Sequence, residues 1–175
     1  MTKDRIFLIG FMGVGKTTIA ELYASKNDCV WIDTDTYIQS QQGCSVQEIF
    51  AGYGEAYFRK LETEAILEAV KTQEDKSKKQ CIVSCGGGIV LKQENVCFMK
   101  EQGAIVYLRA GIQTLVSRLQ SAEGRPVLQE GKKTLEERVA ELMQLRAVFY
   151  ENAADVIVDT DDLTPEEVVE QLMRK

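Results

Sequence analysis

The sequence contains no histidine, although the chain is 175 residues long. Its five cysteines form no Cys-x-x-Cys pair, so the chain lacks the ligand pattern of the usual zinc sites. Without histidine, a general base that works near neutral pH must be a carboxylate, lysine, cysteine or tyrosine. We interpret the cysteines as reduced and mostly buried, which favours the reducing environment of the cytoplasm.

Long apolar segments and excess positive charge are also missing. No stretch approaches the roughly 18 uninterrupted apolar residues that a membrane-spanning helix needs. The first residues, MTKDRIFLIGFMG, lack the extended apolar region of a secretory signal. The formal net charge is −6, which disfavours a nucleic-acid or membrane surface as a partner. We therefore expect a cytoplasmic protein, in which an anionic substrate would need a local cluster of basic side chains.

Short β-rich apolar segments alternate with stretches of helical periodicity. The predicted strands cover residues 5–9, 29–32, 81–84, 104–108 and 155–158. The predicted helices cover residues 16–26, 34–42, 45–51, 55–72, 92–101, 111–120, 134–152 and 164–174. This alternation predicts an α/β fold with parallel strands and covering helices, in one domain over residues 1–175. The polar connection at 121–133 is long enough to predict either disorder or a functional lid.

A glycine-rich loop follows the first predicted strand. Gly10, Gly15, Lys16 and Thr17 form the pattern Gly-x-x-x-x-Gly-Lys-Thr, with a predicted helix after it. In this setting the backbone N–H groups of the loop and the positive end of the helix dipole face the phosphates of a nucleotide. Lys16 is placed to reach the β and γ phosphates, and Thr17 to ligate Mg²⁺. An ordinary glycine turn is the alternative, and the strand and helix on either side disfavour it.

Two carboxylates, Asp33 and Asp35, follow the second predicted strand. If strand geometry continues, both side chains face the same side, about 7 Å apart. Ligands of open parallel sheets bind at this carboxyl end of the strands. One acid could then serve the metal and the other the hydroxyl that accepts the phosphoryl group. The alternative is that one of them only caps the helix that begins near residue 34.

Two arginines occupy unfavourable positions in predicted helices. Arg59 lies near the start of a helix, where a cation opposes the helix dipole. Arg146 lies on the apolar stripe of the helix at 134–152, and an inward arginine is costly unless it meets an anion. The stripe consists of Leu135, Val139, Leu142 and Phe149. The two arginines could bind a carboxylate together, or each could instead pair with a nearby surface acid.

Two further features point to a ligand. Arg125 lies beside Pro126 in the connection at 121–133 and could close over the γ-phosphate as an arginine finger. Gly86, Gly87 and Gly88 follow the third predicted strand, and a run without side chains lets the backbone approach a ligand closely. A flexible turn is the alternative for this run.

Together these motifs resemble the shikimate kinase family over nearly the full chain. The resemblance is carried by GFMGVGKTT at 10–18, DTD at 33–35, GEAYFR at 54–59, GGG at 86–88, Arg125 with Pro126, and Arg146 followed by Tyr150. It implies a kinase of aromatic amino acid biosynthesis that moves the γ-phosphoryl group of ATP onto the 3-hydroxyl of shikimate. It also implies the P-loop kinase fold, a three-layer α/β/α sandwich whose five-stranded parallel sheet has the order 2-3-1-4-5.

The resemblance implies a role for each matching residue. Asp35 would contact the shikimate hydroxyls and accept the proton of the 3-hydroxyl, with Lys16 and Arg125 acting on the phosphates. Arg59, Gly87 and Arg146 would bind the carboxylate, with residues 33–72 forming a substrate-binding region and 121–133 a mobile lid. Mg²⁺ would be held by Thr17 and, through water, by Asp33. ATP would contact Gly13, Val14, Gly15, Lys16, Thr17, Thr18, Arg118, Arg125 and Pro165, of which Arg118 and Pro165 enclose the adenine.

Two features depart from the family pattern. Cys85 precedes the glycine triplet, where the family often has threonine or another small residue, so the support of Mg²⁺ from the third strand is open. The lid at 121–133 is rich in Glu and Gln, which leaves its dynamics open.

Two other functions are alternatives: a related kinase acting on an acid such as gluconate, and an ATP-binding regulator without catalysis. Arg59, Gly87 and Arg146 disfavour the first, and Asp35 and Arg125 disfavour the second. We expect a monomer whose partners are the small molecules ATP and shikimate.

Overall fold

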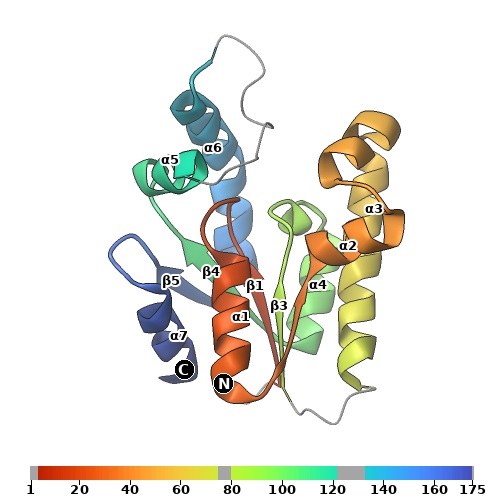
Figure 1. Ribbon diagram of the computed structural model, residues 1–175, viewed down its shortest axis with the longest axis vertical. Helices are drawn as coiled ribbons and strands as arrows, with labels where there is room; N and C mark the ends of the chain where they lie inside the picture. Colours follow the sequence, from red (N-terminus) through yellow and green to blue (C-terminus); the bar gives the residue numbers. More distant parts are fainter. Residues whose placement is uncertain (1–3, 75–79, 122–132, 175) are drawn as a thin grey trace.

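The structure is a computed structural model, and it describes residues 4–74, 80–121 and 133–174. Figure 1 shows a central sheet with helices on both faces. Within the described residues, no helix is both long enough and apolar enough to cross a membrane. The predicted arginine finger, Arg125, lies outside the described residues, as does most of the predicted lid.

The sheet contains five strands, all paired in parallel. They are β1 (Arg5–Ile9), β2 (Val30–Asp33), β3 (Cys81–Ser84), β4 (Ala104–Arg109) and β5 (Val156–Asp159). Their order is β2-β3-β1-β4-β5, which confirms both the predicted α/β class and the order implied by the family resemblance. The register pairs Ser84 with Asp33 on one side and with Leu8 on the other. The carboxyl ends of β1, β2 and β3 therefore meet at one edge of the sheet.

Seven α-helices are seen in the described residues, at positions close to the predicted ones. They are α1 (Lys16–Asn27), α2 (Thr34–Gln42), α3 (Val46–Glu74), α4 (Gln93–Gln102), α5 (Ile112–Ser121), α6 (Leu135–Ala153) and α7 (Pro165–Arg174). The two helices predicted at 45–51 and 55–72 form α3, whose helical geometry is interrupted at Gly54 (φ 79°, ψ 173°). That backbone conformation is open almost only to glycine. A short 3₁₀ helix, η1 (Ile89–Leu91), follows the glycine triplet and was not predicted.

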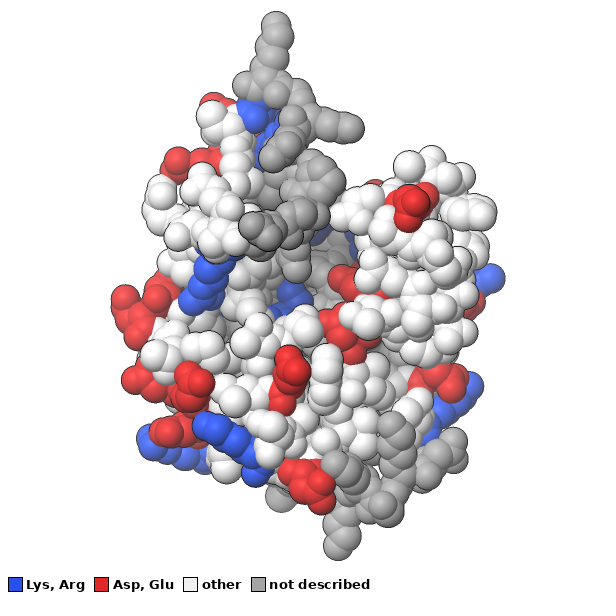
Figure 2. Space-filling view, in the orientation of Figure 1, with Lys and Arg blue, Asp and Glu red and all other residues white. Residues whose placement is uncertain are grey.

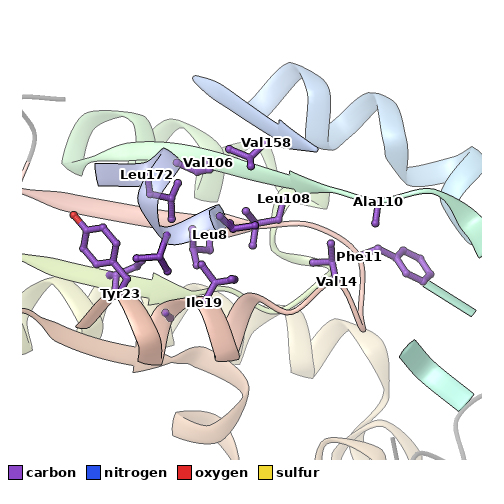
Figure 3. Close-up of a cluster of buried hydrophobic side chains, with 14 of the residues drawn as sticks. Leu8, Phe11, Val14, Ile19, Tyr23, Val106, Leu108, Ala110, Val158 and Leu172 are labelled. Atoms are coloured by element: carbon purple, nitrogen blue, oxygen red, sulfur yellow. The ribbon is translucent and has the colours of Figure 1, made fainter. Parts of the chain in front are cut away.

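Two apolar cores lie on opposite faces of the sheet because successive side chains of a strand point to opposite sides. Ile6 and Leu8 of β1 join the core beneath α1, α5 and α7, part of which is drawn in Figure 3. Phe7 and Ile9 join the other core, together with side chains of α3, α4 and α6. A third, smaller cluster holds α2 against α3 through Ile38, Ile49, Phe58, Leu61 and Ala65. The α2–α3 pair thus has a core of its own at the carboxyl edge of the sheet.

The inward face of α6 differs from the predicted stripe. Phe149 was assigned to that stripe, but its side chain is 44% exposed, whereas Val139 and Tyr150 are fully buried. Residues 139, 146, 150 and 153 follow helical spacing, so Arg146 does lie on the inward face, next to Tyr150 rather than Phe149. The helix begins at a reciprocal cap in which the Thr134 and Glu137 side chains each accept a backbone N–H of the other residue. This cap fixes the residue at which α6 begins.

Candidate active site

The glycine-rich loop connects β1 to α1 and curves around the amine of Lys16. Gly10, Gly13 and Gly15 all have positive φ angles, and a Cβ on Gly10 would lie 2.5 Å from the carbonyl oxygen of Leu108. The Lys16 Nζ donates hydrogen bonds to the carbonyl oxygens of Gly10 (2.8 Å) and Phe11 (3.0 Å). The loop therefore has the shape predicted for a phosphate-binding loop, with the lysine charge on its inner side.

A carboxylate and two hydroxyls meet beside this loop. Thr17 Oγ1 donates to Asp33 Oδ2 at 2.7 Å, and Ser84 Oγ donates to the same oxygen at 2.8 Å. The other Asp33 oxygen accepts the backbone N–H of Thr36 (2.9 Å) and so caps α2. Burial raises the pKa of Asp33, but these hydrogen bonds outweigh it and hold the pKa below its usual value. Asp33 is therefore ionised at neutral pH.

This group of oxygens suits Mg²⁺, which prefers oxygen ligands and usually combines one or two carboxylates with water and substrate phosphates. The described residues contain no cluster of three or more acidic, cysteine or histidine side chains that could hold a metal without such help. Ser84 is a functional candidate that the sequence reasoning missed, and it provides an oxygen at the end of the third strand. Ser84 could have been predicted, because it ends a strand that lies next to the strand ending at Asp33. Cys85 does not provide that support, since its fully buried thiol lies 3.9 Å from the Met99 sulfur.

The expected geometry of the two aspartates is wrong. β2 ends at Asp33 and α2 begins at Thr34, so strand spacing does not extend to Asp35. Asp33 is a helix cap, as the structural alternative proposed, and it also contacts Thr17. Asp35 lies in the first turn of α2, and its side chain is directed at Gly86. The chain turns between the two acids, so one faces the phosphate loop and the other faces the glycine triplet.

Acidic and basic side chains from α2 and α3 surround the glycine triplet, and Arg146 from α6 acts electrostatically on one of them, Glu62. A Cβ on Gly86 would lie 2.6 Å from Asp35 Oδ1 and 2.8 Å from Glu62 Oε1, and a Cβ on Gly88 would collide with the Arg59 guanidinium. Arg59 also pairs with Glu62 (2.6 Å) and with Glu55 (2.8 Å). Side chains of the site therefore occupy the space that a Cβ would need at Gly86 and at Gly88. We call Asp35, Arg59, Glu62 and Arg146 the carboxylate–arginine cluster.

Glu62 is the second residue that the sequence reasoning missed. Its side chain is only 1% exposed, and burial raises its pKa to about 7 against the lowering effects of Arg59 and Arg146. The pairing of Arg59 with acids was the structural alternative for that arginine. Arg59 pairs with these acids and at the same time lies against Gly88, so the pairing does not remove it from the cluster. A buried acid one turn after Arg59, on the apolar face of α3, could have been noticed in the sequence.

The cluster adjoins the phosphate loop. A Cβ on Gly87 would lie 3.6 Å from the Gly10 carbonyl oxygen and 3.7 Å from the Met12 nitrogen. The buried thiol of Cys85 feels the charges of both regions: Lys16 and Asp33 from the phosphate side, and Glu62 and Asp35 from the cluster. Figure 2 shows a hollow on this face of the molecule, with basic atoms on its floor and acidic atoms on the side of α2 and α3. The predicted phosphate and substrate residues thus line one site, with their charges close together.

The proposed adenine residues lie further along the same edge. Arg118, from α5, donates hydrogen bonds to the carbonyl oxygens of Val14 (3.1 Å) and Thr160 (2.8 Å). Thr160 follows β5, and Pro165, which is exposed, begins α7 after a short turn. Arg118 therefore links the phosphate loop to the segment that precedes Pro165.

A parallel sheet of this order, with a phosphate loop after β1 and a polar site at its carboxyl edge, defines a P-loop kinase. The family model for shikimate kinase matches residues 12–175. The chain belongs to the shikimate kinase family.

Individual relatives agree with the family match. The shikimate kinase of Thermodesulfovibrio yellowstonii is 40% identical over 97% of this chain and 93% of its own length. The solved structure of shikimate kinase from Bacteroides thetaiotaomicron has a TM-score of 0.86 and 33% identity, covering 97% of this chain and 96% of that one. A shikimate kinase from Acinetobacter baumannii, solved in complex with shikimate, has a TM-score of 0.85 and 26% identity, covering 99% of this chain and 92% of that one.

Proposed function

We propose that this protein transfers the γ-phosphoryl group of ATP to the 3-hydroxyl of shikimate, giving shikimate 3-phosphate and ADP in aromatic amino acid biosynthesis. The observation that carries the proposal is the place of the glycine triplet: Gly86 and Gly88 lie against side chains of the carboxylate–arginine cluster, and Gly87 lies near the phosphate loop. A nucleotide bound at the loop would have its terminal phosphate near a site with two arginines and two carboxyl groups. That combination fits an acceptor with a hydroxyl at one end and a carboxylate at the other.

Asp35 is the proposed general base. Its carboxylate lies against Gly86, next to the residue that adjoins the phosphate loop, where a hydroxyl of the acceptor would lie. Accepting the proton of that hydroxyl as the bond to phosphorus forms would contribute about 10²- to 10⁴-fold in rate. Glu62 is less suited to this role because one of its carboxylate oxygens is already bound to the Arg59 guanidinium.

Arg59 and Arg146 are the proposed carboxylate ligands. Guanidinium groups bind carboxylates through two parallel hydrogen bonds, which orient the ligand as well as attract it. Arg59 is already held by Glu62 and Glu55, so its guanidinium is positioned before substrate arrives. The backbone of Gly87 lies between these arginines and the phosphate loop and would line the same pocket.

The phosphate side is proposed to use Lys16, Thr17 and Asp33. Lys16 would exchange the loop carbonyls for β and γ phosphate oxygens and neutralise their charge. Thr17 would ligate Mg²⁺ directly, and Asp33 through water, with the Ser84 hydroxyl beside them. Bound there, Mg²⁺ would stabilise charge on the transferring phosphate. Gly13, Val14, Gly15 and Thr18 would contribute backbone or hydroxyl contacts to the phosphates.

Further parts of the proposal rest on the sequence. Arg125, outside the described residues, remains the proposed arginine finger, within a lid at 121–133 that excludes water from the reaction. Arg118 and Pro165 are proposed to enclose the adenine, with residues 33–72 forming the substrate-binding region. We also propose that the protein works in the cytoplasm as a monomer, binding ATP and shikimate and neither nucleic acid nor membranes.

A coupled assay of ADP release tests the function directly. We expect ADP release to depend on shikimate and to remain near background with gluconate or with no acceptor. Release with gluconate alone would favour a different small-molecule kinase. Tight nucleotide binding without release for any acceptor would favour an ATP-binding regulator, and either result would overturn the proposal.

A further inference from the structure

We propose that Tyr150 is a positioning residue, which holds the glycine triplet and Arg146 in the arrangement that binds the acidic end of the acceptor. The inference rests on the proposed function and deepens it, because it assigns a role to a residue that does not itself need to touch the substrate. Tyr150 lies on α6, four residues after Arg146, so the two side chains share one face of the helix.

The contact with the glycine triplet is direct. The Tyr150 hydroxyl donates a hydrogen bond of 2.5 Å to the carbonyl oxygen of Gly87. The carbonyl oxygens of Gly86 and Gly88 accept the backbone N–H groups of Ile89 (3.1 Å) and Leu91 (3.0 Å), within the turn itself. The Gly87 carbonyl is therefore the point at which α6 holds the turn in place.

The hydroxyl also meets Arg146. Burial raises the pKa of Tyr150 to about 12, against the lowering effect of the nearby Arg146 guanidinium. The Tyr150 hydroxyl therefore stays protonated at neutral pH and can donate its hydrogen bond to the Gly87 carbonyl, with the Arg146 guanidinium close by.

Holding this carbonyl has a consequence for the next amide. The Gly87 C=O and the Gly88 N–H belong to one planar peptide unit and point in opposite directions. Fixing the carbonyl therefore fixes the direction of the Gly88 N–H, at the residue against which Arg59 lies. The Tyr150 hydroxyl thus fixes the position of the turn beside Arg59 and orients the neighbouring Arg146 side chain. We expect its loss to affect acceptor binding more than the chemical step.

Core packing is the competing explanation, since the Tyr150 ring is fully buried and stacks on Tyr107 with ring centroids 5.1 Å apart. Packing requires the ring, whereas positioning requires the hydroxyl. Tyr150→Phe separates the two because it keeps the ring. Tyr107→Phe is the matched control, since it removes the same atom from the stacking partner.

The test compares steady-state kinetics and thermal unfolding of the two variants with those of the wild type. For Tyr150→Phe we expect the KM for shikimate to rise about tenfold, as for loss of a hydrogen bond involving a charged group. The kcat and the KM for ATP should stay within about twofold of wild type, and shikimate binding measured by calorimetry should weaken in parallel. Tyr107→Phe should leave the KM for shikimate unchanged.

A second comparison uses the Arg146→Ala background. If Tyr150 acts partly through Arg146, Tyr150→Phe should raise the KM by a smaller factor there than in the wild type. An unchanged KM in Tyr150→Phe would overturn the inference, as would an equal rise in Tyr107→Phe, which would indicate packing alone. Failure of the proposed function would look different, because the wild type itself would then release no ADP with shikimate.

Discussion

The phosphate loop and the carboxylate–arginine cluster lie side by side at one edge of the sheet, yet they are built in different ways. The loop is one continuous segment whose shape comes from glycine backbone angles and from carbonyl contacts of Lys16. The cluster draws its side chains from α2, α3 and α6: Arg59 forms an ion pair with Glu62, and Arg146 acts electrostatically on the same acid. Local preferences therefore suffice for the first region, whereas the second depends on tertiary packing that brings opposite charges together.

The largest expected effect is a loss of catalysis from the phosphate loop with no loss of acceptor binding. Lys16→Met should lower kcat by about 10²- to 10³-fold or more, because it removes a positive charge aimed at the transferring phosphate. Shikimate binding, measured by calorimetry without nucleotide, should stay near the wild-type value. Loss of shikimate binding in this variant would show that the regions are not independent.

A substitution in the cluster should have the opposite pattern. Arg146→Lys should raise the KM for shikimate by about ten- to a hundredfold, because an ammonium cannot reproduce a guanidinium's paired hydrogen bonds. The KM for ATP should hardly change. Initial rates at saturating ATP over a range of shikimate concentrations measure the effect, and an unaltered KM would remove Arg146 from the pocket.

The glycine triplet allows a finer comparison within the cluster. Gly88→Ala should displace the Arg59 guanidinium and raise the KM for shikimate about tenfold, because its Cβ would collide with that group. The Gly88 backbone, at φ −102°, already suits alanine, so strain in the turn does not explain the effect. In Gly87→Ala the new Cβ meets nothing closer than 3.6 Å. Its melting temperature, followed by circular dichroism, should match that of the wild type. A large drop would mean that the turn itself is intolerant of side chains.

The next expected effect is on stability and not on activity: a pH dependence due to Glu62, whose pKa is raised to about 7. The folded protein holds this proton more tightly than the unfolded chain, so the stabilisation is complete below about pH 4.5 and is lost as the pH rises through 7. Each pKa unit corresponds to about 1.4 kcal/mol, so the loss is at most on the order of 3 kcal/mol. Urea unfolding between pH 5 and 8 should show this decline, and Glu62→Gln should flatten it.

The same proton should influence acceptor binding. Above pH 7 the Glu62 carboxylate competes with the substrate carboxylate for Arg59, so the KM for shikimate should rise roughly three- to tenfold between pH 6.5 and 8.5. Glu62→Gln cannot ionise and should show a flat profile. A wild-type KM that stays level over this range would contradict the assignment of the proton to Glu62.

The contrast between the two regions also explains what the sequence could predict. The phosphate loop and the α/β class follow from local pattern, and both were predicted from residues alone. The strand order came from the family resemblance. Ser84 was missed because its partner, Asp33, is distant in sequence. Glu62 pairs with Arg59 three residues before it, so its pairing could have been predicted, but its burial beside Asp35 depends on tertiary packing.

Two local errors have physical causes as well. Strand spacing was extended to Asp35, but the side chain of Asp33 caps a helix at that point and ends the strand. Phe149 was placed inward by a stripe counted from Leu135 and Leu142, which are partly buried against one core, whereas Tyr150 belongs to the core on the other face of the sheet. Tyr150, not Phe149, completes that face, because it has both an apolar ring to bury and a hydroxyl that reaches Gly87.

The break in helical geometry at Gly54 divides α3 into two segments whose rotations are independent of each other. In an unbroken helix, inserting one residue upstream would turn everything after it by about 100° and swing Arg59 and Glu62 away from the glycine triplet. Because the chain leaves helical geometry at Gly54, the rotation of the second segment of α3 is set anew after that point. A change in the length or tilt of residues 46–53 would therefore leave the rotation of Arg59 and Glu62 toward the glycine triplet unchanged.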